Sequence, residues 1–235
     1  MNRVILLVFA HPDDESFGLA GTVSKYSHQE VPVDLICATR GEKGTRLDVP
    51  ANTDTGTARE LELRTAAAIM GIRHIYLLGY MDGELDKAAP GEIRDRVLTI
   101  MRRVKPEVVI TFGPDGITGH PDHIAIGKAA SEAFDRLVVG GKGPRKLYYV
   151  TIPASAASDS DFDVATRPDD QVTTAIDITG YLDKKIKAIS AHRSQQDARE
   201  FIEFLQQDKE SIFARKEFLY LANSGVKSKE TDLLQ

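Results

Sequence analysis

Two short clusters of histidine and carboxylate residues are the part of this sequence best suited to chemistry. Residues 11–15 read HPDDE, and residues 120–123, near the middle of the chain, read HPDH. Each cluster places metal-binding and proton-transfer groups within a few residues, and each comes after an apolar run that predicts a buried strand. Helix capping explains one or two of these residues but not both clusters together. The pair therefore predicts a hydrolytic metal site.

Length, charge and cysteine content restrict the classes of protein to consider. A chain of 235 residues is long enough for one α/β domain with a sizeable core. Its net charge of −5 gives no electrostatic reason to expect a nucleic acid or an anionic membrane as partner. Cys37 is the only cysteine, which excludes a disulfide within the chain and a thiolate metal cage. The apolar run before His11 is too short for a signal peptide or a membrane span, so we expect a cytoplasmic protein.

Short β-branched runs alternate with longer amphipathic stretches, a pattern that is typical of strand-helix units on a mostly parallel sheet. Strands are expected at residues 3–9, 32–38, 75–78, 108–112 and 146–152, with a sixth extended stretch at 171–178. Helices are expected at residues 16–28, 57–70, 91–104, 121–138, 180–193 and 197–206. We predict a single Rossmann-like, three-layer α/β domain over residues 1–223 and a flexible tail over residues 224–235.

The wiring of such a sheet brings the two clusters together. In a doubly wound sheet of order 3-2-1-4-5, the first and fourth strands are neighbours, and ligands bind outside their carboxyl ends. The two clusters follow these two strands, which predicts one active site there. The glycine fingerprint of a dinucleotide site is missing, and three acids stand where a pyrophosphate would need bare amides.

The same motifs resemble those of a known family of zinc-dependent de-N-acetylases. It includes phosphatidylinositol-glycan deacetylases, LmbE-like proteins, and the deacetylases of the mycothiol and bacillithiol pathways. Further similarity lies in the glycine-rich segment 40–44, the helix pattern of residues 59–72, the turn at Asp82 and the late segment HRSQ at 192–195. The resemblance spans about residues 3–200. It implies a hydrolase that removes the N-acetyl group from an N-acetylglucosamine-type sugar or glycoside.

The resemblance also implies the metal ligands. His11, Asp14 and His123 would hold the metal, which is zinc by resemblance, with Fe²⁺ or another divalent metal left open. Two imidazoles and one carboxylate agree with this, because they leave coordination positions for water and a carbonyl oxygen. Zinc in such a site can lower the pKa of its water toward ~7 and polarise an amide carbonyl.

The catalytic roles follow in the same way. By resemblance, Asp13 is the general base and His120 stabilises the oxyanion or acts as general acid. Asp122 lies between the two histidines of its cluster, and we expect it to orient His120 through a hydrogen bond or to cap the following helix.

Several polar residues outside the two clusters are candidates for binding the substrate. Arg40, Glu42, Arg64 and Asp82 are candidate partners for sugar hydroxyls or an anionic aglycone, and the late signature places His192 near the site. The chain has no tryptophan to stack on a sugar ring, so polar groups must do more of the recognition. We expect a small amino-sugar substrate, no nucleic acid and no membrane, with a homo-oligomer possible.

Three alternative functions stay open. One is an amidase of the same family that acts on a thiol-sugar conjugate. Two histidines and a carboxylate also form the facial triad of non-haem iron oxygenases, but the strand-helix pattern opposes that class. A non-catalytic sugar-binding module would need neither a base at Asp13 nor an acid at His120.

Overall fold

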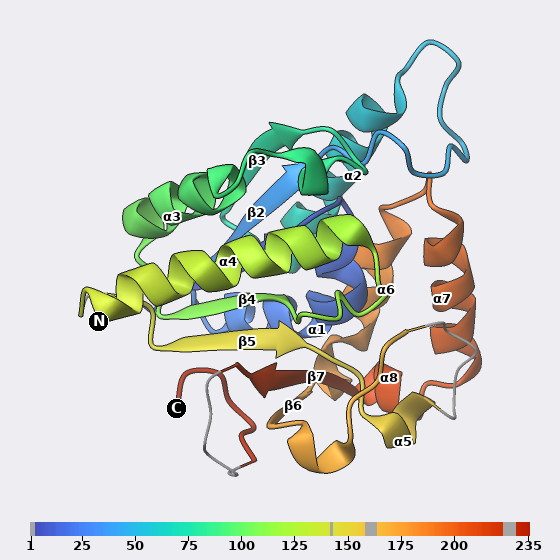
Figure 1. Ribbon diagram of the computed structural model, residues 1–235. Helices are drawn as coiled ribbons and strands as arrows, with labels where there is room; N and C mark the ends of the chain where they lie inside the picture. The colour runs from blue at the N-terminus through green and yellow to red at the C-terminus, as the bar shows by residue number, and fades with distance from the viewer. Residues whose placement is uncertain (1–2, 142, 158–163, 223–228) are drawn as a thin grey trace.

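The computed structural model describes residues 3–141, 143–157, 164–222 and 229–235, and these contain one seven-stranded sheet (Figure 1). The strand order is β3-β2-β1-β4-β5-β7-β6. The strands are β1 (Ile5–Phe9), β2 (Val33–Thr39), β3 (His74–Tyr80), β4 (Val108–Phe112), β5 (Lys146–Val150), β6 (Thr174–Asp177) and β7 (Lys216–Leu221). Strands β1 to β5 run parallel in the predicted order, whereas β7 runs antiparallel to both β5 and β6. The predicted α/β class and the central wiring are confirmed.

Helices cover both faces of the sheet. The helices are α1 (Asp14–His28), α2 (Thr55–Met70), α3 (Glu92–Val104), α4 (Pro121–Val139), α5 (Ala154–Ala157), α6 (Leu182–Ser190), α7 (Gln196–Gln207) and α8 (Ile212–Arg215). Short 3₁₀ turns lie at Leu85–Lys87, Asp169–Gln171 and Thr179–Tyr181. Helices α1, α2 and α6 contact one another on one face, and α3 contacts α4 on the other (Figure 1). The result is the predicted three-layer fold. Within the described part of the chain, none of these helices combines the length and apolar character needed to span a bilayer.

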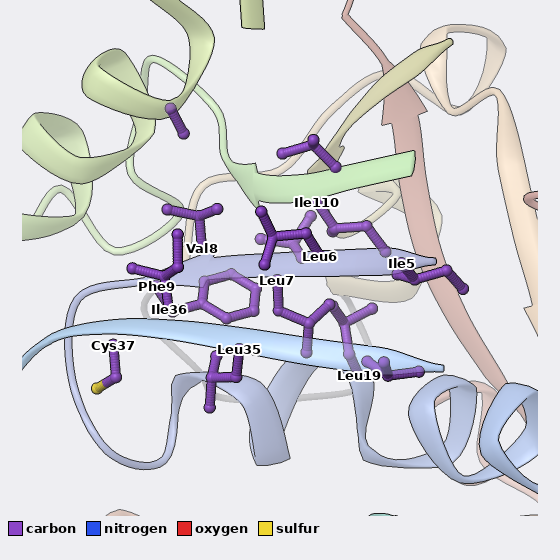
Figure 2. Packing of buried hydrophobic residues seen from close by; sticks show 14 of the residues in the cluster. Ile5, Leu6, Leu7, Val8, Phe9, Leu19, Leu35, Ile36, Cys37 and Ile110 are labelled. Atoms are coloured by element: carbon purple, nitrogen blue, oxygen red, sulfur yellow. The ribbon is translucent and has the colours of Figure 1, made fainter. Parts of the chain in front are cut away.

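The central strands are buried on both faces. Every residue of β1 and β2 is buried, which explains why β1 is continuously apolar and why β2 is apolar apart from Asp34 and Thr39, rather than alternating. Figure 2 shows their side chains packed with Leu19 of α1 and Ile110 of β4. Cys37 belongs to this cluster, and burial raises the pKa of its thiol well above the usual value. It is a core residue, as the sequence predicts.

Strand β7 was not predicted from the sequence. It begins with the charged pair Lys216 and Glu217, and its apolar run is confined to the last four residues. Its two buried residues, Glu217 and Leu219, alternate with less buried ones, and the strand pairs with both β5 and β6.

The end of the chain differs from the flexible tail that the sequence predicts. Residues 224–228 lie outside the described residues, but residues 229–235 pack against the domain. The Leu233 side chain is fully buried in the main core. Glu230 lies 2.9 Å from Lys146 Nζ and accepts a hydrogen bond from the Tyr148 hydroxyl. The burial of Leu233 and the contacts of Glu230 with Lys146 and Tyr148 are the physical reasons why this segment packs against the domain.

A buried ion pair holds α6 against α1 and β7. Lys185 Nζ lies 3.0 Å from Glu217 Oε1, and both side chains are only 2 % exposed. The Glu217 carboxylate also accepts hydrogen bonds from the backbone N–H groups of Gly21 and Thr22 in α1. The pair therefore fixes the position of α6, whose carboxyl end leads into the 192–195 segment.

We predict that Lys185→Met lowers the free energy of unfolding by about 3–5 kcal/mol, because it leaves the buried Glu217 carboxylate without its counter-charge. Arg215→Met is the matched control, since its pair with Glu210 is exposed on both sides. The control should cost less than about 1 kcal/mol. Chemical denaturation measures both, and equal losses would contradict a stabilising role for the buried pair.

Candidate active site

The two histidine-aspartate clusters meet at the carboxyl ends of β1 and β4, as predicted. His11 lies just beyond β1, and His123 lies in the first turn of α4, which follows β4. Their rings approach until His11 Nδ1 is 3.2 Å from His123 Nε2. Residues far apart in sequence are neighbours here because β1 pairs directly with β4.

The environment of His123 fixes which ring nitrogen is free. Its Nδ1 lies 3.0 Å from the Gly116 carbonyl oxygen, which can only accept a hydrogen bond. The neutral ring therefore carries its proton on Nδ1 and directs the Nε2 lone pair toward His11. The ring also stacks on Phe112, with centroids 4.0 Å apart and planes 5° from parallel, so packing fixes its orientation.

His11 is oriented by two carboxylates behind its ring. Its Nε2 lies 3.1 Å from Asp82 Oδ1 and 3.2 Å from Asp122 Oδ2, and both aspartates are buried. These acceptors place a proton on Nε2 and turn Nδ1 toward His123. Burial lowers the pKa of His11, but the hydrogen bonds to Asp122 and Asp82 outweigh it and raise the pKa to about 10. The site favours a positive charge at this ring.

The Asp14 carboxylate lies beside the free nitrogens of the two rings, with Oδ1 near His123 and Oδ2 3.9 Å from His11 Nδ1. Asp14 Oδ1 lies 3.3 Å from His123 Nε2, while Asp14 Oδ2 accepts the backbone N–H of His11 at 2.8 Å. Two such nitrogens 3.2 Å apart need a proton or a metal ion between them, and a proton on His11 Nδ1, which the raised pKa of His11 favours, is one way to meet this need. Ligand atoms of a tetrahedral zinc ion are about 3.3–3.4 Å apart, given Zn–N bonds of about 2.0–2.1 Å. The donor set thus fits a divalent metal.

Other groupings of donor atoms are present around His11. Among the described residues, the donors of His11, His120 and His123 lie within 4.8 Å of one another, as do those of His11, Asp82 and Asp122. The two aspartates already accept backbone N–H groups: Asp122 accepts those of Gly83 and Leu85, and Asp82 accepts that of Lys43. Asp14 Oδ2 is held in the same way by the backbone N–H groups of Ala10 and His11, so His11 presents Nε2 to two fixed carboxylates and Nδ1 to His123 and Asp14.

The pKa values of the adjacent residues Asp13 and Asp14 are shifted in opposite directions. Burial opposes ionisation of Asp14, but His123 and His11 hold its pKa below the usual range. Burial raises the pKa of Asp13 to about 6, although the Arg59 guanidinium lowers it. Asp14 therefore stays a carboxylate beside the histidines, and Asp13 is poised to exchange a proton near neutral pH. Such a divergence is typical of a pair with two different roles.

Arg59 is a site residue that the sequence analysis did not assign. It extends from α2 and is only 4 % exposed, yet it carries a full charge. Its Nη2 donates to Asp13 Oδ2 at 2.9 Å and to the Pro12 carbonyl at 2.6 Å, and Nη1 donates to the Gly41 carbonyl at 3.0 Å. A Cβ on Gly41 would lie 2.3 Å from Nη1, so glycine is needed there. An arginine on the buried face of a helix is the signal that could have revealed it.

His120 presents a hydrogen-bond donor to the site. It caps α4, where its Nδ1 accepts the backbone N–H of Asp122 at 3.1 Å, so the neutral ring carries its proton on Nε2. Burial and the charges of His11 and His123 lower its pKa, which keeps the ring neutral. The predicted orientation of His120 by the Asp122 carboxylate is wrong, because that carboxylate contacts His11 instead. Helix capping, the other role considered for Asp122, belongs to His120.

The predicted substrate-binding residues separate into two groups. Arg40 lies at the rim beyond β2, half-exposed, with its Nε 2.9 Å from Glu60 Oε2. Glu42 is close by and accepts the backbone N–H of Asp82 at 3.2 Å, which ties the loop after β2 to the turn after β3. Asp82 itself is 5 % exposed and bound to His11, so its role as a partner for sugar hydroxyls is corrected to orientation of His11.

Arg64 and His192 do not line the site. Arg64 is exposed in the second half of α2, pairs with Glu60, and borders a shallow cavity with His74 at the amino end of β3. This is the opposite end of the strands. His192 is fully buried, and its Nε2 lies 3.1 Å from Glu15 Oε1, so a substrate does not reach it.

The family model described as GlcNAc-PI de-N-acetylase (PIG-L) matches residues 6–134, which include both clusters. The chain belongs to this family. It is 34 % identical, over 82 % of its length and 81 % of the relative, to a probable N-acetyl-α-D-glucosaminyl L-malate deacetylase 2 of Bacillus anthracis. It is 30 % identical, over 97 % of its length and 98 % of the relative, to a 1D-myo-inositol 2-acetamido-2-deoxy-α-D-glucopyranoside deacetylase of Saccharomonospora viridis.

Solved structures confirm the fold. The crystal structure of GalB, the 4-carboxy-2-hydroxymuconate hydratase of Pseudomonas putida KT2440, superposes with a TM-score of 0.74 over 95 % of this chain and 98 % of that one, at 22 % identity. Because that protein is named as a hydratase, the fold alone does not decide the chemistry, and the residues of the site must.

We predict that His123→Ala and Asp14→Ala abolish stoichiometric metal binding, since each removes one of the three ligands expected from the sequence. Asp122→Asn should keep the metal but weaken the affinity for it by about 10–100-fold, because the Asp122 carboxylate orients His11 and is not itself a proposed ligand. His74→Ala, at an exposed histidine, is the control. Elemental analysis and competition titration measure the effects. Full metal content in His123→Ala, with loss in Asp122→Asn, would place the metal on the other side of His11.

Proposed function

We propose that this protein is a zinc-dependent hydrolase that removes the N-acetyl group from an N-acetylglucosamine-type glycoside, with His11, Asp14 and His123 as metal ligands. One observation carries this proposal most strongly. The free nitrogens of two imidazoles face each other at 3.2 Å, with the Asp14 carboxylate beside them. Membership of the family and the names of two similar relatives support the reaction.

The chemistry that zinc supplies in such a site is Lewis-acid activation of water and polarisation of the amide carbonyl. Asp13 takes the proton of the attacking water. Arg59 holds its Oδ2, so we assign the proton to Oδ1. A pKa raised to about 6 by burial suits a base that accepts this proton and then gives it to the departing amine. The amide C–N bond breaks, and acetate and the free amino sugar are released.

His120 acts on the carbonyl oxygen. Its Nδ1 is occupied by the backbone N–H of Asp122, which leaves Nε2–H as the donor that faces the site. The lowered pKa keeps this ring neutral near pH 7, so we assign it hydrogen bonding to the oxyanion rather than charge. Its ring centroid lies 4.8 Å from that of His11, close to where the carbonyl must bind.

The substrate we propose is a glucosaminide with a small polar aglycone. The two relatives are named for malate and inositol glycosides. Arg40 and Glu42 stand at the rim, where a hydroxyl or carboxylate of the aglycone would meet them. Acetate release from the zinc-loaded protein should be measured with N-acetylglucosaminyl malate, N-acetylglucosaminyl inositol and free N-acetylglucosamine. A thiol-sugar amide in the same panel tests the amidase alternative, and oxygen consumption tests the iron oxygenase. No turnover of any acetamido sugar would refute the proposal.

We predict that Asp13→Asn keeps its zinc and loses about 10²–10⁴-fold in turnover, the usual contribution of a positioned general base. The change preserves size and the contact with Arg59 but removes the proton acceptor. Turnover and zinc content are measured on the same sample, with Asp14→Asn as the metal-losing control. Zinc loss in Asp13→Asn would make Asp13 a ligand.

For His120→Ala, we predict retention of zinc and a loss of about 10²–10³-fold in turnover, on the scale of one oxyanion donor. The reason is that the ring donates through Nε2 and does not hold the metal. If this variant loses its zinc, His120 is a third histidine ligand. If turnover stays near normal, His120 has no part in the reaction.

A further inference from the structure

A buried hydrogen-bonded group lies directly beneath the turn that carries Asp13. Glu15 and His192 are both 0 % exposed, and His192 Nε2 lies 3.1 Å from Glu15 Oε1. The Ser16 hydroxyl donates to the same Glu15 oxygen at 2.6 Å. The group joins the start of α1 to the segment between α6 and α7. The reaction proposed above uses none of these side chains directly.

Glu15 controls the backbone of Asp13. The φ angle of Asp13 is 112°, in the left-handed region that residues other than glycine rarely adopt. Its backbone N–H donates to Glu15 Oε2 at 3.1 Å, and its carboxylate is held by Arg59. A strained backbone persists only where surrounding contacts over-determine it, and such strain is concentrated at functional sites. The Glu15 carboxylate is one of these contacts.

His192 holds Glu15 in turn, and it does so at a cost. Its Nε2 faces Glu15, but its Nδ1 is buried and has no hydrogen-bond partner among the described residues. A buried polar atom without a hydrogen-bond partner lowers the stability of the folded protein. The side chain is therefore explained by what its Nε2 does for Glu15.

The residues that follow His192 hold the long loop after β2. The Ser194 carbonyl accepts hydrogen bonds from Leu47 N at 3.0 Å and from Thr45 Oγ1 at 2.7 Å. Gln195 Nε2 donates to the Thr45 carbonyl at 3.1 Å. In Figure 1 this loop lies beside the start of α7. One short turn, residues 192–195, thus contacts both the support of the base and a loop at the rim of the site.

We propose that His192 is a positioning residue for Asp13, acting through Glu15, and that the 192–195 turn couples this base to the seating of the 40–56 loop. The inference rests on the proposed function, since it takes Asp13 as the base. It assigns one end of the turn to the rate of the chemical step and the other end to substrate binding.

A matched pair of substitutions tests the assignment. His192→Gln places an amide nitrogen where Nε2 stood, and His192→Asn places it where Nδ1 stood, so only the first can still reach Glu15. We expect His192→Asn to lower kcat by roughly 10–10²-fold with KM nearly unchanged, because a misplaced base slows the chemical step without weakening binding. His192→Gln should recover most of kcat, and zinc content should stay the same in both. Gln195→Ala should instead raise KM, because it frees the loop.

Several results would overturn the inference. Equal kcat values for the Gln and Asn variants would do so, as would an effect of His192→Asn on KM alone. Crystal structures of the two variants give a readout that needs no activity. The left-handed Asp13 and its Arg59 contact should persist in the Gln variant and be lost in the Asn variant. If both variants keep the left-handed Asp13 and its contact with Arg59, the inference fails. This outcome is separate from failure of the proposed function, which would appear as an inactive wild-type protein.

Discussion

The site depends on the way in which two imidazole rings are made to face each other. Each ring donates its proton to an acceptor behind it, His123 to the Gly116 carbonyl and His11 to the Asp82 and Asp122 carboxylates. The two facing nitrogens then repel unless a proton or a metal ion lies between them. Parallel pairing of β1 with β4 supplies the proximity, and the acceptors supply the direction. The same contacts explain why neither ring is free to rotate away.

A second constraint comes from having Asp13 and Asp14 adjacent in sequence. In the proposed mechanism, one carboxylate faces the histidines and the other faces the water that it deprotonates. Asp13 has a left-handed backbone conformation, with its N–H held by Glu15 and its carboxylate held by Arg59. Burial raises the pKa of Asp13, whereas His123 and His11 hold the pKa of Asp14 below its usual range despite burial. A hydratase with the same fold shows that such local contacts, rather than the sheet, define the chemistry.

Much of this could be predicted from the sequence, for identifiable reasons. The aliphatic runs of β1 and β4 and the wiring of a doubly wound sheet were enough to bring His11 and His123 together. The roles of Asp122 and Asp82 could not be predicted, because they depend on which way a ring turns inside the site. Arg64 was misplaced because helical spacing does not say which end of a helix lies near the site. Strand β7 was missed because it begins with two charged residues, and the packed chain end was missed because its sequence is mostly polar, with only Leu233 and Leu234 as apolar anchors.

The central claim is that a metal binds on the Nδ1 side of His11. Anomalous diffraction from a crystal of the zinc-loaded protein, recorded on both sides of the zinc absorption edge, locates the ion directly. We predict a single peak about 2.0–2.2 Å from His11 Nδ1, His123 Nε2 and an Asp14 oxygen. A peak on the Nε2 side of His11, between Asp82 and Asp122, would contradict the account.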